Sequence, residues 1–105
     1  MSDSIADATF IANKPGGESR LVQIAIGLPY RTERDWRCPV AVHGLFERLP
    51  DVSGEDSLQA LGLAYALVGK LLRQFVATGG RLRSRGDDGT EADEDVPLDA
   101  YFAGE

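Results

Sequence analysis

The longest run of periodic apolar residues in the chain extends from Ser53 to Gly80. At about 100° per residue, most of its large apolar side chains fall on one arc and most polar ones on the other, which predicts one amphipathic helix. We expect Leu61, Tyr65, Val68 and Leu72 to face the core. The apolar arc covers about half the circumference of the helix, which is what a helix needs in order to pack on a sheet.

Both ends of this helix carry sequence signals. Ser53 followed by Asp56 is similar to a capping box, and Glu55 and Asp56 suit the positive end of the helix dipole. Gly79 and Gly80 permit the left-handed conformation in which helices end. The sequence therefore predicts a helix that begins after Ser53 and ends at the glycine pair.

Shorter segments show the alternation of strands. In the clearest of them Val22, Ile24, Ile26 and Leu28 share one face. The segment 14–17, Lys-Pro-Gly-Gly, is a turn signal that predicts a hairpin. The predicted strands are Ile5–Ala12, Leu21–Leu28, Cys38–Glu47 and Arg81–Arg85.

The order strand, strand, strand, long helix, short strand indicates an α+β fold. We expect an antiparallel sheet of three to four strands with one long helix packed on one face. The other face is then solvated or covered by a partner, which includes a homodimer through the open sheet face. Residues 1–86 are predicted to form this domain, and residues 87–105 an acidic, partly mobile C-terminal tail.

Charge is unevenly distributed along the 105 residues, whose formal net charge is −6. All 11 basic residues lie at or before Arg85, and eight acidic residues follow it with no basic residue among them. A local acidic run is usually solvated and extended. The alternatives are that the tail shields Arg81, Arg83 and Arg85 or docks on a basic partner. The overall acidic balance argues against nucleic acid as a partner.

The localisation expected from the sequence is cytoplasmic. The first residues lack the basic run and apolar stretch of a signal peptide. Gly62, Gly69, Lys70 and Arg73 interrupt the helix, so we expect no membrane span. A single cysteine, Cys38, excludes an internal disulfide framework.

The sequence contains no constellation typical of catalysis. A nucleophilic Cys38 would need a base, and His43 is the only histidine. In one extended strand residues 38 and 43 face opposite sides, so we expect Cys38 to be buried and inert. No metal site and no cofactor are predicted, because other ligands for His43 are lacking. We therefore favour a protein that is not an enzyme.

The polar segment after the second strand combines arginines with aromatic residues, which is typical of interaction hot spots. The candidate binding residues are Tyr30, Arg31, Arg34, Trp36 and Arg37. The alternative is an ordinary solvated loop with Trp36 folded onto the edge of the core.

Three short motifs are distinctive: Ile-Gly-Leu-Pro at 26–29, Trp-Arg-Cys-Pro at 36–39, and Gly-Glu-Asp-Ser-Leu-Gln-Ala-Leu at 54–61. Together they resemble the motifs of a family of small bacterial proteins to which no activity is attached. The resemblance extends over about residues 20–75 and implies a cytosolic bacterial protein of this size. The acidic tail lies outside it.

Two functions are compatible with these features. The first is a non-enzymatic protein-interaction module whose partner is another protein, by analogy with small acidic immunity proteins that neutralise toxins. The second is an accessory domain that binds a small molecule or an anionic ligand between the sheet edge and the segment 30–37, whose arginines could clamp an anion.

Overall fold

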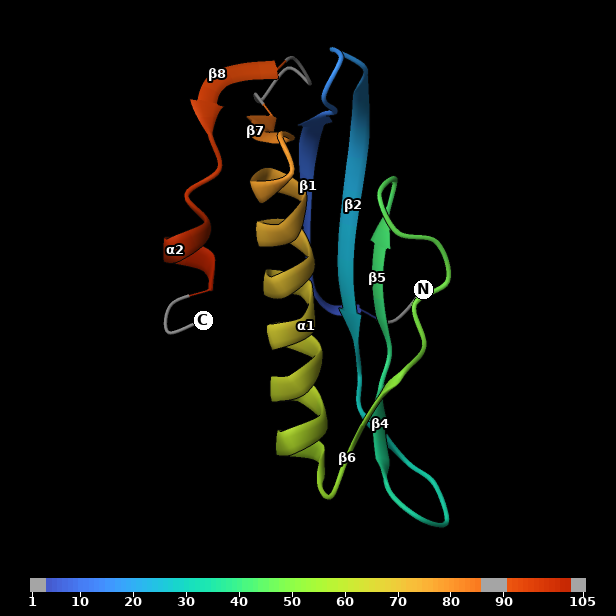
Figure 1. The fold of residues 1–105 in the computed structure, drawn as a ribbon. Helices are drawn as coiled ribbons and strands as arrows, with labels where there is room; N and C mark the ends of the chain where they lie inside the picture. The colour runs from blue at the N-terminus through green and yellow to red at the C-terminus, as the bar shows by residue number, and fades with distance from the viewer. Residues whose placement is uncertain (1–3, 86–90, 103–105) are drawn as a thin grey trace.

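The computed structural model describes residues 4–85 and 91–102 and contains a five-stranded antiparallel sheet in the order β5-β2-β1-β7-β8 (Figure 1). The break predicted at residues 86–89 lies outside the described residues. The strands of this sheet are β1 (Ser4–Asn13), β2 (Ser19–Gly27), β5 (Val40–His43), β7 (Arg81–Arg85) and β8 (Glu91–Asp95).

A smaller antiparallel sheet has the order β3-β4-β6, and its strands are β3 (Tyr30–Arg31), β4 (Trp36–Cys38) and β6 (Val52–Gly54). The prediction of one strand over Cys38–Glu47 is therefore wrong, because this segment contributes to both sheets. Pro39 separates β4 from β5, and proline has no N–H to donate to a ladder. Gly44 ends β5 with φ +103°, a conformation that favours glycine.

The long helix α1 (Ser57–Ala77) lies on one face of the five-stranded sheet and runs along its long strands, and the short helix α2 (Leu98–Tyr101) lies beside it (Figure 1). This confirms the predicted α+β class with one long helix on an antiparallel sheet. The cap differs from the prediction: Asp56 is the N-cap and accepts the Gln59 N–H at 2.7 Å, while Ser53 lies in β6. The Gln59 side chain in turn accepts the Glu55 N–H at 2.7 Å.

Fewer large side chains of α1 are buried than we predicted. Val68 and Leu72 are buried as expected, but Tyr65 is 42% exposed and Leu61 only half-buried. Small residues lie against the sheet instead, and they allow the helix backbone to approach it closely. The buried residues of the helix are Ala60, Ala64, Val68, Gly69 and Leu72.

The inner face of the sheet supplies the other half of the core. Val22, Ile24 and Ile26, which we predicted to share one face of a strand, are buried on β2. Leu28 is not, because β2 ends at Gly27 and the following residue is 65% exposed. On β1, Phe10 and Ala12 of this face are buried.

The chain returns to the core after β8. We call residues 95–102 the C-terminal strap; it runs alongside α1 in Figure 1. Val96 and Phe102 of the strap are buried with 8% and 4% exposure. A Cβ on Gly69 would lie 2.9 Å from the Phe102 ring, so this mid-helix glycine provides the space for the ring. The boundary at residue 86 and the mobility of the tail stay predictions.

By length and composition alone, α1 is apolar enough to cross a membrane, with a mean hydropathy of 1.3. Core helices of soluble proteins pass the same test. Here one face of the helix packs on the sheet, and four large apolar residues remain exposed: Leu58, Leu63, Tyr65 and Val76.

Candidate functional site

Strands β3 and β4 form a hairpin whose turn is held by one side chain. The Thr32 hydroxyl accepts the N–H groups of Arg34 and Asp35 at 3.2 and 3.1 Å and donates to the Asp35 carboxylate at 2.7 Å. The Thr32 N–H also donates to the Asp35 carbonyl at 2.7 Å. Threonine and aspartate are typical of such turns because their side chains satisfy nearby backbone groups. The turn residues thus have a defined geometry.

The hairpin separates the predicted binding residues onto two faces. Tyr30 pairs with Arg37, and Arg31 pairs with Trp36. Residues opposite each other in an antiparallel pair point to the same side, so the two pairs face opposite directions. Arg34 lies in the turn between the strands. The five candidates therefore do not form one cluster.

The first face of the hairpin is tied to the loop that follows β5. The Tyr30 hydroxyl donates to the Asp51 carboxylate. This hydrogen bond raises the pKa of Tyr30, because the proton is shared with a negatively charged acceptor. Arg37, on the same face, pairs with Asp35 at 3.3 Å. These polar groups already have partners within the hairpin and its neighbouring loop.

The turn also affects the acid–base properties of Asp35. The hydrogen bond from Thr32, followed by the charge of Arg37, holds the pKa of the Asp35 carboxyl below its usual value, against the opposing effect of burial. Asp35 is therefore a carboxylate at neutral pH that stabilises the turn.

The second face of the hairpin borders an exposed apolar groove of about 450 Å³. Trp36 forms one side of it, and the first turn of α1 forms another. Leu58 is 78% exposed and Leu28 is 65% exposed, which is unusual for large apolar side chains that lie together. We call this the Trp36 groove; its residues are Ile5, Leu28, Pro29, Trp36, Ser57, Leu58 and Leu61.

Sequence reasoning identified Trp36 but missed the rest of this groove. Leu28 and Leu58 continue the apolar periodicity of a strand and a helix, and periodicity alone assigns them to the core. The available signal was Pro29, which ends β2 and removes Leu28 from the sheet.

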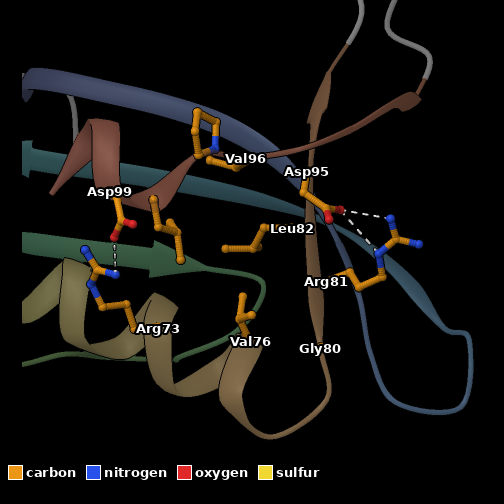
Figure 2. Close-up of a pocket in the computed structure, with 10 residues that line it drawn as sticks. Arg73, Val76, Gly80, Arg81, Leu82, Asp95, Val96 and Asp99 are labelled. Carbon is orange, nitrogen blue, oxygen red and sulfur yellow. Dashed lines mark hydrogen bonds and ion pairs between the residues drawn. The ribbon is translucent and has the colours of Figure 1, made fainter.

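A different pocket, of about 330 Å³, lies between the end of α1, β7 and the strap (Figure 2). An ion pair lies at each side of it: Arg73 with Asp99 at 2.8 Å, and Arg81 with Asp95 at 2.9 Å. Figure 2 shows Leu82 and Val76 between these pairs. Each arginine is already paired with a strap carboxylate, so these charges hold the strap and do not offer a binding site for an anion. Arg73 also donates to the Phe102 carbonyl at 3.0 Å.

Cys38 and His43 do not form a catalytic pair. Cys38 is fully buried, and His43 is exposed and pairs with Gln23 at the β2–β5 ladder. Burial raises the pKa of the Cys38 thiol, and the charge of Asp51 raises it further. Among residues 4–85 and 91–102 no group of three or more potential metal ligands is found.

These features define a small α+β domain with one long helix, a strap alongside that helix and an exposed apolar groove at one end. The chain belongs to a family described as a domain of unknown function, DUF6968, whose model matches residues 10–93. This family assignment agrees with the resemblance to a family without a known activity. Searches of curated proteins and of solved structures found no match.

Proposed function

We propose that this protein is a non-enzymatic interaction module that binds another protein through the Trp36 groove. The observation that carries the proposal is the gathering of exposed Leu28, Leu58 and Ile5 around Trp36 at one end of the molecule. Exposed apolar side chains that lie together mark interaction sites more often than isolated ones do. Tryptophan is among the residues enriched in interface hot spots.

The size of the groove limits what enters it. A volume of about 450 Å³ holds one or two apolar side chains and not a whole helix. Stable interfaces bury about 800 Å² on each partner, so the groove is the anchor of a larger contact that also includes the hairpin. The partner segment therefore presents an apolar anchor residue.

Two arginines beside Trp36 indicate what flanks this anchor. Arg31 shares the face of Trp36, and Arg34 is exposed in the adjacent turn. Neither has an ion-pair partner among the described residues. Carboxylates beside the anchor would complement these arginines and speed the encounter. The proposed partner is thus a protein segment with an apolar anchor and acidic neighbours.

A small anionic ligand is the less favoured alternative. Arg37 is paired with Asp35, and it lies on the opposite side of the hairpin from Arg31. The three arginines of the hairpin therefore do not converge on one anion.

A second copy of the chain is also less favoured. In a twofold contact the groove of one chain would face the same groove of the other chain. The same arginines would then lie close to each other, and two chains with a net charge of −6 each would repel. The open face of the sheet is no better suited, because its central row contains the polar residues Thr9, Gln23 and His43.

The test is position-specific photocrosslinking in cells that express the protein natively. A photoreactive phenylalanine analogue replaces Leu58 or, separately, Leu28. The control position is Thr78, exposed at the other end of α1. We expect one adduct from the two groove positions and none from position 78. The yield of this adduct should fall several-fold when the chain also carries the substitution Arg31→Glu.

Two other kinds of result would contradict the proposal. Equal adducts from positions 58 and 78, or none from the groove, would refute binding at the groove. An adduct with a second copy of the chain, together with a dimer by light scattering, would replace the proposed partner by a homodimer.

A further inference from the structure

A further cavity lies on the inner side of the sheet, beneath the end of the strap. Its volume is about 150 Å³. Strands β1 and β2 form its floor with Ala8, Ile24 and Ile26, and Val68 of α1 forms one wall. Ile24, Ile26 and Val68 are buried, so the floor and wall of the cavity are aliphatic. We call it the strap cavity.

The cavity exists because two inner-face positions of β1 are small. Ala6 and Ala8 precede Phe10 on the same face, and Ala8 pairs with Ile24. A larger side chain at either position would occupy the space. Phe102 does not fill it, because the ring packs against Gly69 on α1.

The open side of the cavity is bordered by aromatic rings. Phe10 meets Tyr101 edge-on with ring centroids 5.5 Å apart. Tyr65 lies over Phe102 at 4.8 Å. The two tyrosines are 42% and 45% exposed, so they form the rim, whereas Phe10 and Phe102 are buried. A ligand that enters would lie beside these four rings.

We propose that the strap cavity binds a small neutral molecule that contains one aromatic ring. An apolar cavity of about this volume can hold a benzene-sized guest. Aromatic rings gain from edge and offset contacts with other rings beyond the area they bury, which favours an aromatic guest over an aliphatic one. This site is separate from the Trp36 groove, so either proposal can fail without the other.

The lining also argues against a cationic guest. Aromatic rings attract quaternary ammonium groups. However, a cation placed on the aliphatic floor would lose its hydration, and no buried charged side chain is found among the described residues to compensate. Asp7 is the one charged residue of the lining, and it pairs with Ala25 on the other face of the sheet from Ala6 and Ala8, so its carboxylate is directed away from the floor. The neutral ring is therefore the better match.

The experiment follows the methyl signals of Ile24, Ile26 and Val68 by NMR while benzyl alcohol is added. Cyclohexylmethanol and tetramethylammonium are added in parallel as the saturated and cationic probes. We expect benzyl alcohol to shift these three signals and to bind at least several-fold more tightly than the other two probes. At about ten times its dissociation constant it should raise the melting temperature by about 6 °C or more.

Two variants test the location. Ala8→Leu should weaken binding at least about tenfold by filling the cavity. The matched control is Ala25→Leu, on the other face of the sheet, which should leave the affinity unchanged. If the Ala8 variant does not fold, Ala6→Leu replaces it, since Ala6 is exposed at the rim.

Three results would overturn the proposal. One is the absence of shifts at Ile24, Ile26 and Val68 at high benzyl alcohol concentration. Another is undiminished binding in the folded Ala8 or Ala6 variant. The third is an equal or tighter affinity for one of the other two probes. Such a result with cyclohexylmethanol would show that the site does not prefer an aromatic ring, and with tetramethylammonium that it does not prefer a neutral ligand.

Discussion

Leu72 is the residue whose truncation tests the helix-on-sheet core most directly. Its side chain is fully buried between α1 and the sheet. Leu72→Ala removes three carbon atoms, and at about 0.8 kcal/mol for each the lost transfer free energy is about 2.4 kcal/mol. The unfilled cavity adds to this loss, so the free energy of unfolding should fall by about 2–5 kcal/mol.

The assay is urea unfolding followed by circular dichroism, with Leu63→Ala as the matched control. Leu63 lies on the same helix and is 47% exposed, so the same substitution there should cost less than about 0.5 kcal/mol. A loss of about 2–5 kcal/mol lowers the melting temperature of a domain of this size by about 8 °C or more. Equal losses for the two leucines would refute the assignment of the buried helix face.

Other expected outcomes concern the strap, the cap, the thiol and the hairpin turn. Phe102→Ala should lower the free energy of unfolding by about 3–5 kcal/mol, because the ring is buried against α1; a loss like that of a surface change would show that the strap is not part of the core. Asp56→Ala should cost about 1 kcal/mol in urea melts through loss of the N-cap hydrogen bond. Cys38 should react with a thiol reagent far more slowly in native buffer than in denaturant, and labelling at the rate of a free thiol would contradict its burial. Thr32→Val should raise the pKa of Asp35 in an NMR titration, since its main cause of lowering is removed. A carboxyl group whose pKa is lower in the folded state than in the unfolded state stabilises the fold above its unfolded-state pKa. This contribution is lost as the pH falls through the folded-state pKa. The Thr32 variant should therefore lose less stability on acidification than the natural chain.

The periodicity of apolar residues predicted those elements in which apolar and polar side chains alternate regularly between a buried and an exposed face. Val22, Ile24 and Ile26 alternate with smaller or polar residues, and they are buried on one face of β2. The long helix was predicted for a similar reason: no other segment is long enough to cover a sheet. Its N-cap was misplaced because Ser53 and Asp56 both satisfy the local capping rule, and the pairing of Ser53 with β4 decides between them.

The candidate site was predicted only in part. Trp36 and the arginines of the hairpin were chosen by residue type, but residue type does not define the side of a hairpin on which each lies. The register of β3 with β4 places Arg31 with Trp36 and sends Tyr30 to the other face. The apolar partners of Trp36 come from β1, the segment after β2 and α1, so no local pattern could join them.

By itself the sequence determined the α+β class, the presence of the long helix and the buried stripe of β2, because these depend on the alternation of apolar and polar residues over a few turns or a few strand residues. The tertiary structure alone decided that Tyr65, which we expected to face the core, remains exposed. It also decided that the strap returns to α1 over Gly69 and that exposed side chains gather around Trp36. The physical reason is that close packing and surface exposure depend on which distant segments meet, and the local pattern of a segment is compatible with more than one neighbour.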